Sequence, residues 1–251
     1  MGSASDKPIR LAILLNDTPQ PKTLARVGNY KAVFSELLTA ACAPESLESQ
    51  LTITSHDVVN DLDSYPALED VDALLLTGSK HTAFEDDPWI LKLVEYTKKA
   101  LDSGRVKVIG VCFGQQIVGR ALGAPLGRSD KGWEVAVTES KLTEKGKKIF
   151  QMEKMRIHQM HRDIVFEFPK DAIPLASNDI CTVQAMYSPG KYIAVQGHPE
   201  FTEALISEVL AIRHGQGIFS DEIYEDAMKR AGIEHDGVAI ARGFLRFLKS
   251  G

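Results

Sequence analysis

One cysteine of this sequence stands where a covalent nucleophile would be placed. Cys112 follows the apolar run 106–111 and precedes an amphipathic stretch, with Gly110 and Gly114 two residues to either side. Small neighbours allow a tight strand-to-helix turn that leaves the middle side chain at the carboxyl edge of a sheet. The N-terminus of the following helix favours a thiolate, and the amide of Phe113 would point at a developing oxyanion. The alternative is a buried structural cysteine.

A histidine and a carboxylate, two residues apart, follow a second predicted strand. His198 and Glu200 come directly after the apolar run 192–196, and Pro199 stiffens the link between them. A cysteine nucleophile needs an imidazole base, and the imidazole needs a partner that fixes its tautomer. Side chains two apart in an extended segment point to the same side, and open α/β sheets build their sites at the carboxyl ends of strands. We therefore predict a catalytic triad of Cys112, His198 and Glu200, against the alternative of a surface turn with an incidental histidine and carboxylate.

The hydrophobic pattern predicts an α/β fold that would position these residues. Short apolar runs alternate with amphipathic stretches, which is typical of a mostly parallel central sheet flanked by helices. Short strand-like pieces between about residues 132 and 181 predict a small antiparallel subregion, and residues 215–251 predict a C-terminal helical tail. The expected strands span residues 9–15, 51–58, 71–77, 106–111, 135–138, 164–168 and 192–196. The expected helices span residues 30–42, 87–96, 113–122, 202–214, 221–231 and 238–248.

Length and composition indicate one globular domain over residues 1–251. Hydrophobic residues make up 44% and charged residues 25% of the chain, and the net charge of -5 argues against nucleic acid and anionic membranes as partners. Three cysteines read as reduced thiols, so Cys42 and Cys181 are interpreted as structural. The polar start, residues 1–6, lacks a signal-peptide core, and no apolar stretch is long enough to span a bilayer. We expect a cytoplasmic protein with no metal and no organic cofactor.

The two motifs together resemble the class I glutamine amidotransferase family. Gly-x-Cys-x-Gly-x-Gln over residues 110–116, followed by Gly-His-Pro-Glu over residues 197–200, is similar to that family's pattern. The resemblance covers roughly the first 215 residues. It implies a flavodoxin-like sheet, a Cys-His-Glu triad and a γ-glutamyl thioester as the intermediate.

The resemblance implies further site residues. The loop 77–84 matches the family loop that supplies a second oxyanion donor, and the segment 160–163 resembles one that lines the substrate pocket. The implied oxyanion donors are the amides of Gly78 or Ser79 and of Phe113. The implied substrate contacts are Gln116, Glu134, His161 and Asp163. Without the resemblance these positions would be interpreted as a strand-to-helix turn, a polar turn, a helix residue and a solvated strand residue.

The sequence departs from synthase-linked members of the family. It has Thr-Gly-Ser-Lys over residues 77–80 where they usually carry Gly-Gly-Pro, and Gln115 where they usually have histidine. The run 78–90 and Ala-Ser-Asn-Asp over residues 176–179 resemble stand-alone γ-glutamyl peptidases that trim glutathione conjugates. We therefore predict a cysteine-dependent hydrolase of a small γ-glutamyl substrate, namely glutathione or a conjugate of it.

Two alternatives to this function stay open at the level of sequence. One is a glutaminase subunit that delivers ammonia to a separate synthase partner, because the chain contains no recognisable synthase domain. The other is a catalytically silent regulatory protein, because a fold does not determine a function. A homodimer is compatible with the sequence, which does not name the leaving group or the role of the helical tail.

Overall fold

The computed structural model describes residues 7–250; residues 1–6, where the sequence predicts no signal peptide, and residue 251 lie outside the described residues. The strands are β1 (Ile9–Leu15), β2 (Leu51–Asp57), β3 (Ala73–Leu76), β4 (Lys107–Val111), β5 (Leu126–Arg128), β6 (Glu134–Leu142), β7 (Lys154–His161), β8 (Asp163–Val165), β9 (Ile173–Ser177), β10 (Ala185–Ser188) and β11 (Tyr192–Val195). The helices are α1 (Pro21–Arg26), α2 (Tyr30–Cys42), α3 (Leu47–Gln50), the 3-10 turn η1 (Leu68–Asp70), α4 (Pro88–Asp102), α5 (Phe113–Ala121), α6 (Glu144–Phe150), α7 (Glu203–Gly215), α8 (Asp221–Ala231) and α9 (Gly237–Lys249).

Within the described residues, one nine-stranded sheet runs through the molecule in the order β2-β1-β3-β4-β11-β10-β9-β6-β7. Strands β2, β1, β3, β4 and β11 are mutually parallel and are called here the parallel half. Strands β10, β9, β6 and β7 continue the sheet in antiparallel pairs and are called the antiparallel half. Strands β5 and β8 form a separate two-stranded sheet. The predicted α/β fold with an antiparallel subregion is confirmed, and most of that subregion extends the main sheet.

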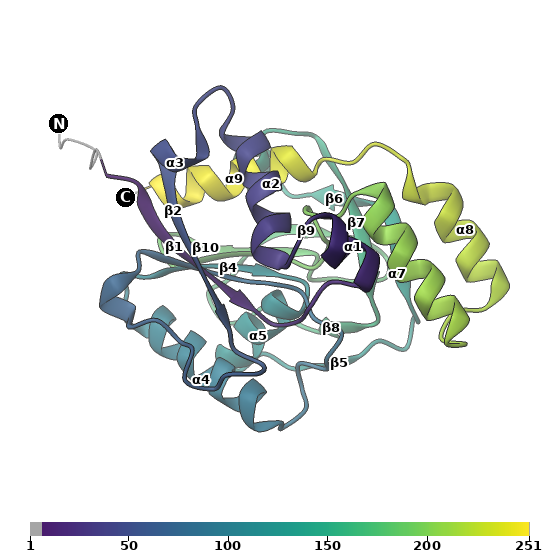
Figure 1. Ribbon diagram of the computed structural model, residues 1–251, viewed down its shortest axis with the longest axis horizontal. Coiled ribbons are helices and arrows are strands. Elements are labelled where there is room, and N and C mark those ends of the chain that lie inside the picture. Colours follow the sequence, from purple (N-terminus) through teal and green to yellow (C-terminus); the bar gives the residue numbers. More distant parts are fainter. Residues whose placement is uncertain (1–6, 251) are drawn as a thin grey trace.

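Helices cover both faces of the sheet. Figure 1 shows α2 and α9 over one face, and α4 and α5 over the other. Each side has its own apolar core, because the strands of the parallel half are buried on both faces and alternate side chains point into different layers. On β4, for example, Ile109 belongs to the layer under α9, whereas Val108 belongs to the layer over α4 and α5.

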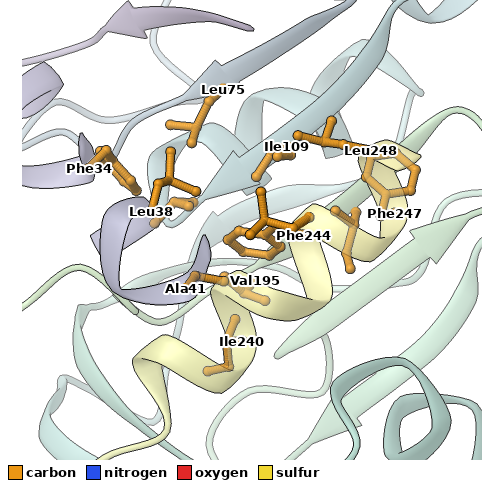
Figure 2. Packing of buried hydrophobic residues seen from close by; sticks show 14 of the residues in the cluster. Phe34, Leu38, Ala41, Leu75, Ile109, Val195, Ile240, Phe244, Phe247 and Leu248 are labelled. Carbon is orange, nitrogen blue, oxygen red and sulfur yellow. The ribbon is translucent and has the colours of Figure 1, made fainter. Parts of the chain in front are cut away.

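The C-terminal helix α9 belongs to the main core. Its apolar face carries Phe244 and Leu248, which pack near Ile109 of β4 and Val195 of β11 (Figure 2). Burying a large apolar side chain contributes about 2 kcal/mol, so a face of this size holds the helix firmly on the sheet. The Nζ of Lys107 also donates to the carbonyl of Leu248 at 2.9 Å, which satisfies one of the free carbonyls at the helix end.

The other part of the predicted tail, α8, packs on the antiparallel half. The guanidinium of Arg230 donates to the carbonyls of Val135 and Val137 on β6, each at 2.8 Å. Residues 215–250 are therefore integrated into the fold, and α7 and α8 lie together at one end of the molecule (Figure 1). No helix formed by residues 7–250 combines the length and the apolar character that crossing a bilayer requires.

Candidate active site

Cys112 lies on a strained turn between β4 and α5. Its backbone has φ 53° and ψ -107°, a conformation that few residues other than glycine adopt. The turn is tight because neighbours without side chains permit close approach: a Cβ on Gly110 would come within 2.8 Å of the Gly114 carbonyl, and one on Gly114 would collide with the Leu76 backbone. Since Phe113 is the first residue of α5, its amide N–H has no partner within the helix.

His198 and Glu200 follow β11, the strand that pairs with β4. The register places Val195 opposite Val111, and the amide of Cys112 donates to the Val195 carbonyl at 2.9 Å. The two chain segments therefore leave the sheet side by side, as parallel strands must at a common carboxyl edge. His198 Nδ1 lies 2.8 Å from Glu200 Oε1, within hydrogen-bonding distance.

The imidazole of His198 is held from three sides. Its backbone amide donates to the His158 carbonyl of β7 at 2.7 Å, and its ring stacks on Phe201 with centroids 4.0 Å apart. Its Nδ1 is hydrogen-bonded to Glu200, and Cys112 lies near enough to interact with the ring electrostatically. With one nitrogen on a carboxylate and the cysteine close by, the ring is placed for proton transfer.

The local charges favour a protonated imidazole. Burial alone lowers the pKa of His198, but the negative charges of the Cys112 thiolate and of Glu200, with their hydrogen bonds, raise it to about 10. The raised pKa describes an imidazolium paired with a thiolate, which is the reactive form of a cysteine nucleophile. The pair is almost fully enclosed, since Cys112 is 4% and His198 is 5% exposed.

The loop after β3 approaches the same atoms. A Cβ on Gly78 would lie 2.6 Å from His198 Cε1 and 3.7 Å from Cys112 Cβ, so only glycine fits at this place. The loop is tied to the end of β1, because Asn16 Nδ2 donates to the Thr77 carbonyl at 2.8 Å. Its backbone is thus held next to the nucleophile, and Ser79 lines the adjoining cavity.

A cavity of about 560 Å³ opens above Cys112. Volumes of this order hold ligands the size of a small drug molecule. Of the residues predicted from sequence, Ser79, Cys112, Phe113, Gln116, His161 and Asp163 line it.

Glu134, predicted as a substrate contact, lies outside this lining. It is 2% exposed and sits behind His161, whose Nε2 lies 3.0 Å from Glu134 Oε2. Asn178 and Gln184 also donate to the carboxylate. Burial raises the pKa of Glu134, but the hydrogen bond and charge of His161, with the bonds from Thr138 and Asn178, outweigh burial and lower the pKa. The carboxylate therefore fixes the orientation of His161 in the cavity wall and does not reach the cavity itself.

Gln196 is a residue of the site that the sequence analysis missed. It is 0% exposed, and its Nε2 lies 3.5 Å from the sulfur of Cys112. The orientation of its amide is set by Gln116, whose Nε2 lies 3.2 Å from Gln196 Oε1 and 2.7 Å from the carbonyl of Asp163. The sequence spacing could have predicted this residue, because Gln196 precedes His198 by two residues and projects to the same side of the extended chain.

Gln115, which stands where synthase-linked relatives usually have histidine, turns away from the site. It is 0% exposed, and its Nε2 donates to the Val183 carbonyl at 2.7 Å, so that it ties α5 to the segment before β10. Cys42 and Cys181 are free and buried. Across residues 7–250, no three His, Cys, Asp or Glu side chains gather in a way that would hold a metal ion.

Comparisons with known proteins show the family of this chain. Residues 28–211 match the model of the family described as glutamine amidotransferase class-I. The chain belongs to this family. A glutamine amidotransferase-like protein of Schizosaccharomyces pombe is 34% identical over 242 residues, which cover 95% of this chain and 98% of that protein.

A further sequence relative and a solved structure also resemble this amidotransferase-like chain. Gamma-glutamyl peptidase 3 of Arabidopsis thaliana is 37% identical over 158 residues, covering 60% of this chain and 61% of the peptidase. The crystal structure of a glutamine amidotransferase from Thermotoga maritima superposes with a TM-score of 0.66 at 17% identity, covering 96% of this chain and 99% of that one. The latter match confirms the flavodoxin-like fold, and the family marks the protein as a glutamine amidotransferase-like hydrolase.

Proposed function

We propose that this protein is a cysteine-dependent hydrolase that cleaves γ-glutamyl amide bonds through a thioester on Cys112. The observation that carries the proposal is the contact of the Cys112 side chain with an imidazole whose other nitrogen lies 2.8 Å from a buried carboxylate. This order of nucleophile, base and orienting group is the requirement for covalent acyl transfer. The adjoining cavity supplies room for the substrate.

In the first half of the proposed reaction, the sulfur of Cys112 attacks the γ-carbonyl carbon. In the resting pair His198 already holds the proton of the thiol, and Glu200 stabilises this imidazolium. The negative charge that develops on the carbonyl oxygen is accepted by the amide of Phe113 and by that of Gly78 or Ser79. His198 then protonates the departing amine, so that a γ-glutamyl thioester remains on Cys112.

In the second half, water replaces the amine. His198 removes a proton from the water, whose oxygen attacks the thioester carbonyl within the same oxyanion donors. Collapse of this intermediate breaks the carbon–sulfur bond and releases glutamate, and the thiolate recovers its pairing with the imidazolium. The net reaction consumes one water and needs no cofactor.

The proposed substrate is glutathione or a conjugate of it. Two observations support a peptide over free glutamine: a cavity of about 560 Å³ accommodates a molecule much larger than glutamine, and the relatives include gamma-glutamyl peptidases. Asn178, in the segment that resembles those peptidases, donates to Glu134 at 2.6 Å and so supports the cavity wall. On this proposal the protein acts alone as a γ-glutamyl peptidase.

The test is a screen of γ-glutamyl compounds with detection of free glutamate and of the acyl-enzyme by mass spectrometry. We expect glutamate release from glutathione or an S-conjugate, a γ-glutamyl adduct on Cys112, and loss of both in Cys112→Ala. Cys42→Ala is the matched control, since that cysteine lies far along the chain on α2 and should leave turnover intact. Strong activity on glutamine alone that rises with a co-purifying synthase would support the ammonia-delivering alternative. A Cys112 that reacts with no γ-glutamyl compound and no thiol reagent would support the silent one.

A further inference from the structure

The cavity wall carries a charge opposite to that of the whole protein. The chain has a net charge of -5, yet the cationic side chains in the lining are Lys80, Arg128, Arg162 and Arg213. Asp163 is the only aspartate or glutamate among the lining residues that the structure describes. A concentration of positive charge in a cleft attracts anionic ligands.

Two of these cations are already neutralised by the protein. Lys80 Nζ lies 2.6 Å from Asp17 Oδ1, and Arg128 Nε lies 3.0 Å from Asp163 Oδ1. Arg213 differs from both, because its guanidinium has no ion pair and no hydrogen bond within residues 7–250. It is a partly buried cation of the cavity wall that finds no acceptor among the residues the structure describes.

The guanidinium of Arg213 is nevertheless fixed in place. It lies 4.8 Å from the ring centroid of Trp133, which in turn packs edge-on against Phe219 at 5.2 Å. Burial lowers the pKa of Arg213, while the negative charge of Cys112 acts in the opposite direction, so the guanidinium lies within electrostatic reach of the reacting sulfur. A stacked guanidinium loses little freedom on binding and presents a fork that matches a carboxylate.

Arg213 lies just beyond the segment that the family model matches. The family match ends at residue 211, and Arg213 comes from the last turn of α7. Gln116 and His161, by contrast, lie within the matched region and line the cavity beside Cys112. The glutamyl group is common to the reactions of the family, whereas the leaving group differs among its members. Arg213, which follows the matched segment and lines the same cavity, is therefore assigned to the leaving group.

We propose that Arg213, stacked on Trp133, is a subsite for a carboxylate on the leaving group. The inference rests on the proposed hydrolase function and narrows it: the substrates are γ-glutamyl peptides with a free C-terminal carboxylate. The guanidinium supplies paired N–H donors to that carboxylate. Glutamine, whose leaving group is ammonia, gains nothing from this contact.

The experiment compares an S-alkylated glutathione with the same peptide carrying a C-terminal glycinamide. In the wild-type protein we expect kcat/KM for the acid to exceed that for the amide by roughly tenfold to a hundredfold, mostly through KM, which is the usual range for a charge-assisted bond. In Arg213→Gln the ratio should fall to about 1, and Arg213→Lys should restore part of it. Arg242→Gln is the matched control, because Arg242 is exposed on α9 and does not line the cavity.

A third substrate identifies which carboxylate Arg213 binds. It carries a 4-aminobutanoyl group in place of γ-glutamyl, and so lacks only the α-carboxylate. If Arg213→Gln lowers kcat/KM for this analogue by the same factor as for the parent peptide, the leaving-group assignment holds. If the penalty disappears with the analogue and persists with the glycinamide, Arg213 binds the glutamyl end and the assignment is overturned.

Binding to Cys112→Ala, measured by calorimetry, separates this inference from the proposed reaction. A wild-type protein that hydrolyses both peptides at equal rates retains the hydrolase function and overturns the subsite. A protein that hydrolyses neither, but whose Cys112→Ala form binds the acid at least tenfold more tightly than the amide in an Arg213-dependent way, retains the subsite and overturns the function. Equal binding of acid and amide overturns the subsite in either case.

Discussion

The two halves of the sheet contribute different parts of the site. The parallel half carries the reactive atoms, since Cys112 follows β4 and His198 follows β11, at one carboxyl edge. The antiparallel half contributes one part of the cavity wall, since Glu134 on β6 holds His161 on β7. The halves are joined by the pairing of β11 with β10, and they also meet where the His198 amide donates to the His158 carbonyl of β7 at 2.7 Å.

This division suggests that chemistry and substrate recognition are separately adjustable in this molecule. Parallel strands bring chain ends together at one edge, so that a nucleophile and its base meet whatever the substrate is. The antiparallel strands instead place a layer of hydrogen-bonded polar side chains next to that edge. We therefore expect changes in the parallel half to lower kcat and changes in the antiparallel half to raise KM.

The largest effect is expected at the orienting carboxylate. Glu200→Gln removes the charge that helps to raise the pKa of His198, and kcat should fall on the order of 10²- to 10⁴-fold with little change in KM. Steady-state kinetics on a γ-glutamyl substrate measures this change. Glu225→Gln, on the exposed face of α8, is the matched control. If kcat of Glu200→Gln stayed within tenfold of the wild-type value, Glu200 would not be part of the catalytic triad.

A somewhat smaller loss is expected at Gly78. In Gly78→Ala the new Cβ would stand 2.6 Å from His198 Cε1, so the imidazole must shift away from its partners. Displacing a catalytic group by a fraction of an ångström to an ångström lowers kcat by about 10²-fold. Gly215→Ala controls for the substitution, because a Cβ there meets nothing within 4 Å. Unchanged kcat in Gly78→Ala would show that the loop after β3 is not held against the imidazole.

The antiparallel half is tested at Glu134. Glu134→Gln replaces an acceptor of several hydrogen bonds by an amide that must itself donate, so His161 loses its fixed orientation. We expect KM to rise roughly tenfold, kcat to change little, and the free energy of unfolding to fall by roughly 3 kcal/mol. Glu139→Gln, exposed on the same strand, is the matched control. If kcat fell and KM did not, the proposed division between the two halves would be wrong.

The smallest effect is a pH dependence at the junction of the halves. Burial, with the nearby His235 and His198, lowers the pKa of His158 from 6.5 to about 3. The unfolded chain therefore binds a proton below about pH 6.5 that the folded protein does not accept, and stability falls as the pH drops. Between pH 6.5 and 4.5 the loss due to this group is about 1.4 kcal/mol per pH unit.

Urea denaturation at several pH values, compared between wild type and His158→Phe, measures this dependence. The variant should lose less stability than the wild type over that interval, because it lacks the group that the unfolded chain protonates. The difference in the free energy of unfolding at pH 7 gives any cost of the substitution that does not depend on pH, and this cost is subtracted from the values at lower pH. Equal pH slopes in the two proteins would show that His158 does not remain neutral when folded.

The parts of the site that could be predicted from the sequence are those that depend on residues close together in the chain. The turn at Cys112 and the pairing of His198 with Glu200 depend on neighbours within a few residues: glycines that permit the bend, and a spacing of two in an extended chain. The oxyanion loop was predicted only from the resemblance to a family. The structure places Gly78 of this loop within contact of His198. Short-range patterns of this kind are visible in the sequence because local geometry determines them.

By itself, the sequence therefore determined the α/β class, the ends of the strands that carry Cys112 and His198, and the family. Only the tertiary structure decided that Glu134 lies behind His161, that Arg213 lines the cavity with no ion pair to any residue of 7–250, and that α9 forms part of the main core. The physical reason is that these three features depend on strand order and helix docking, which join residues far apart in the chain. The periodicity of apolar residues specifies which face of an element is buried, but not which distant element buries it.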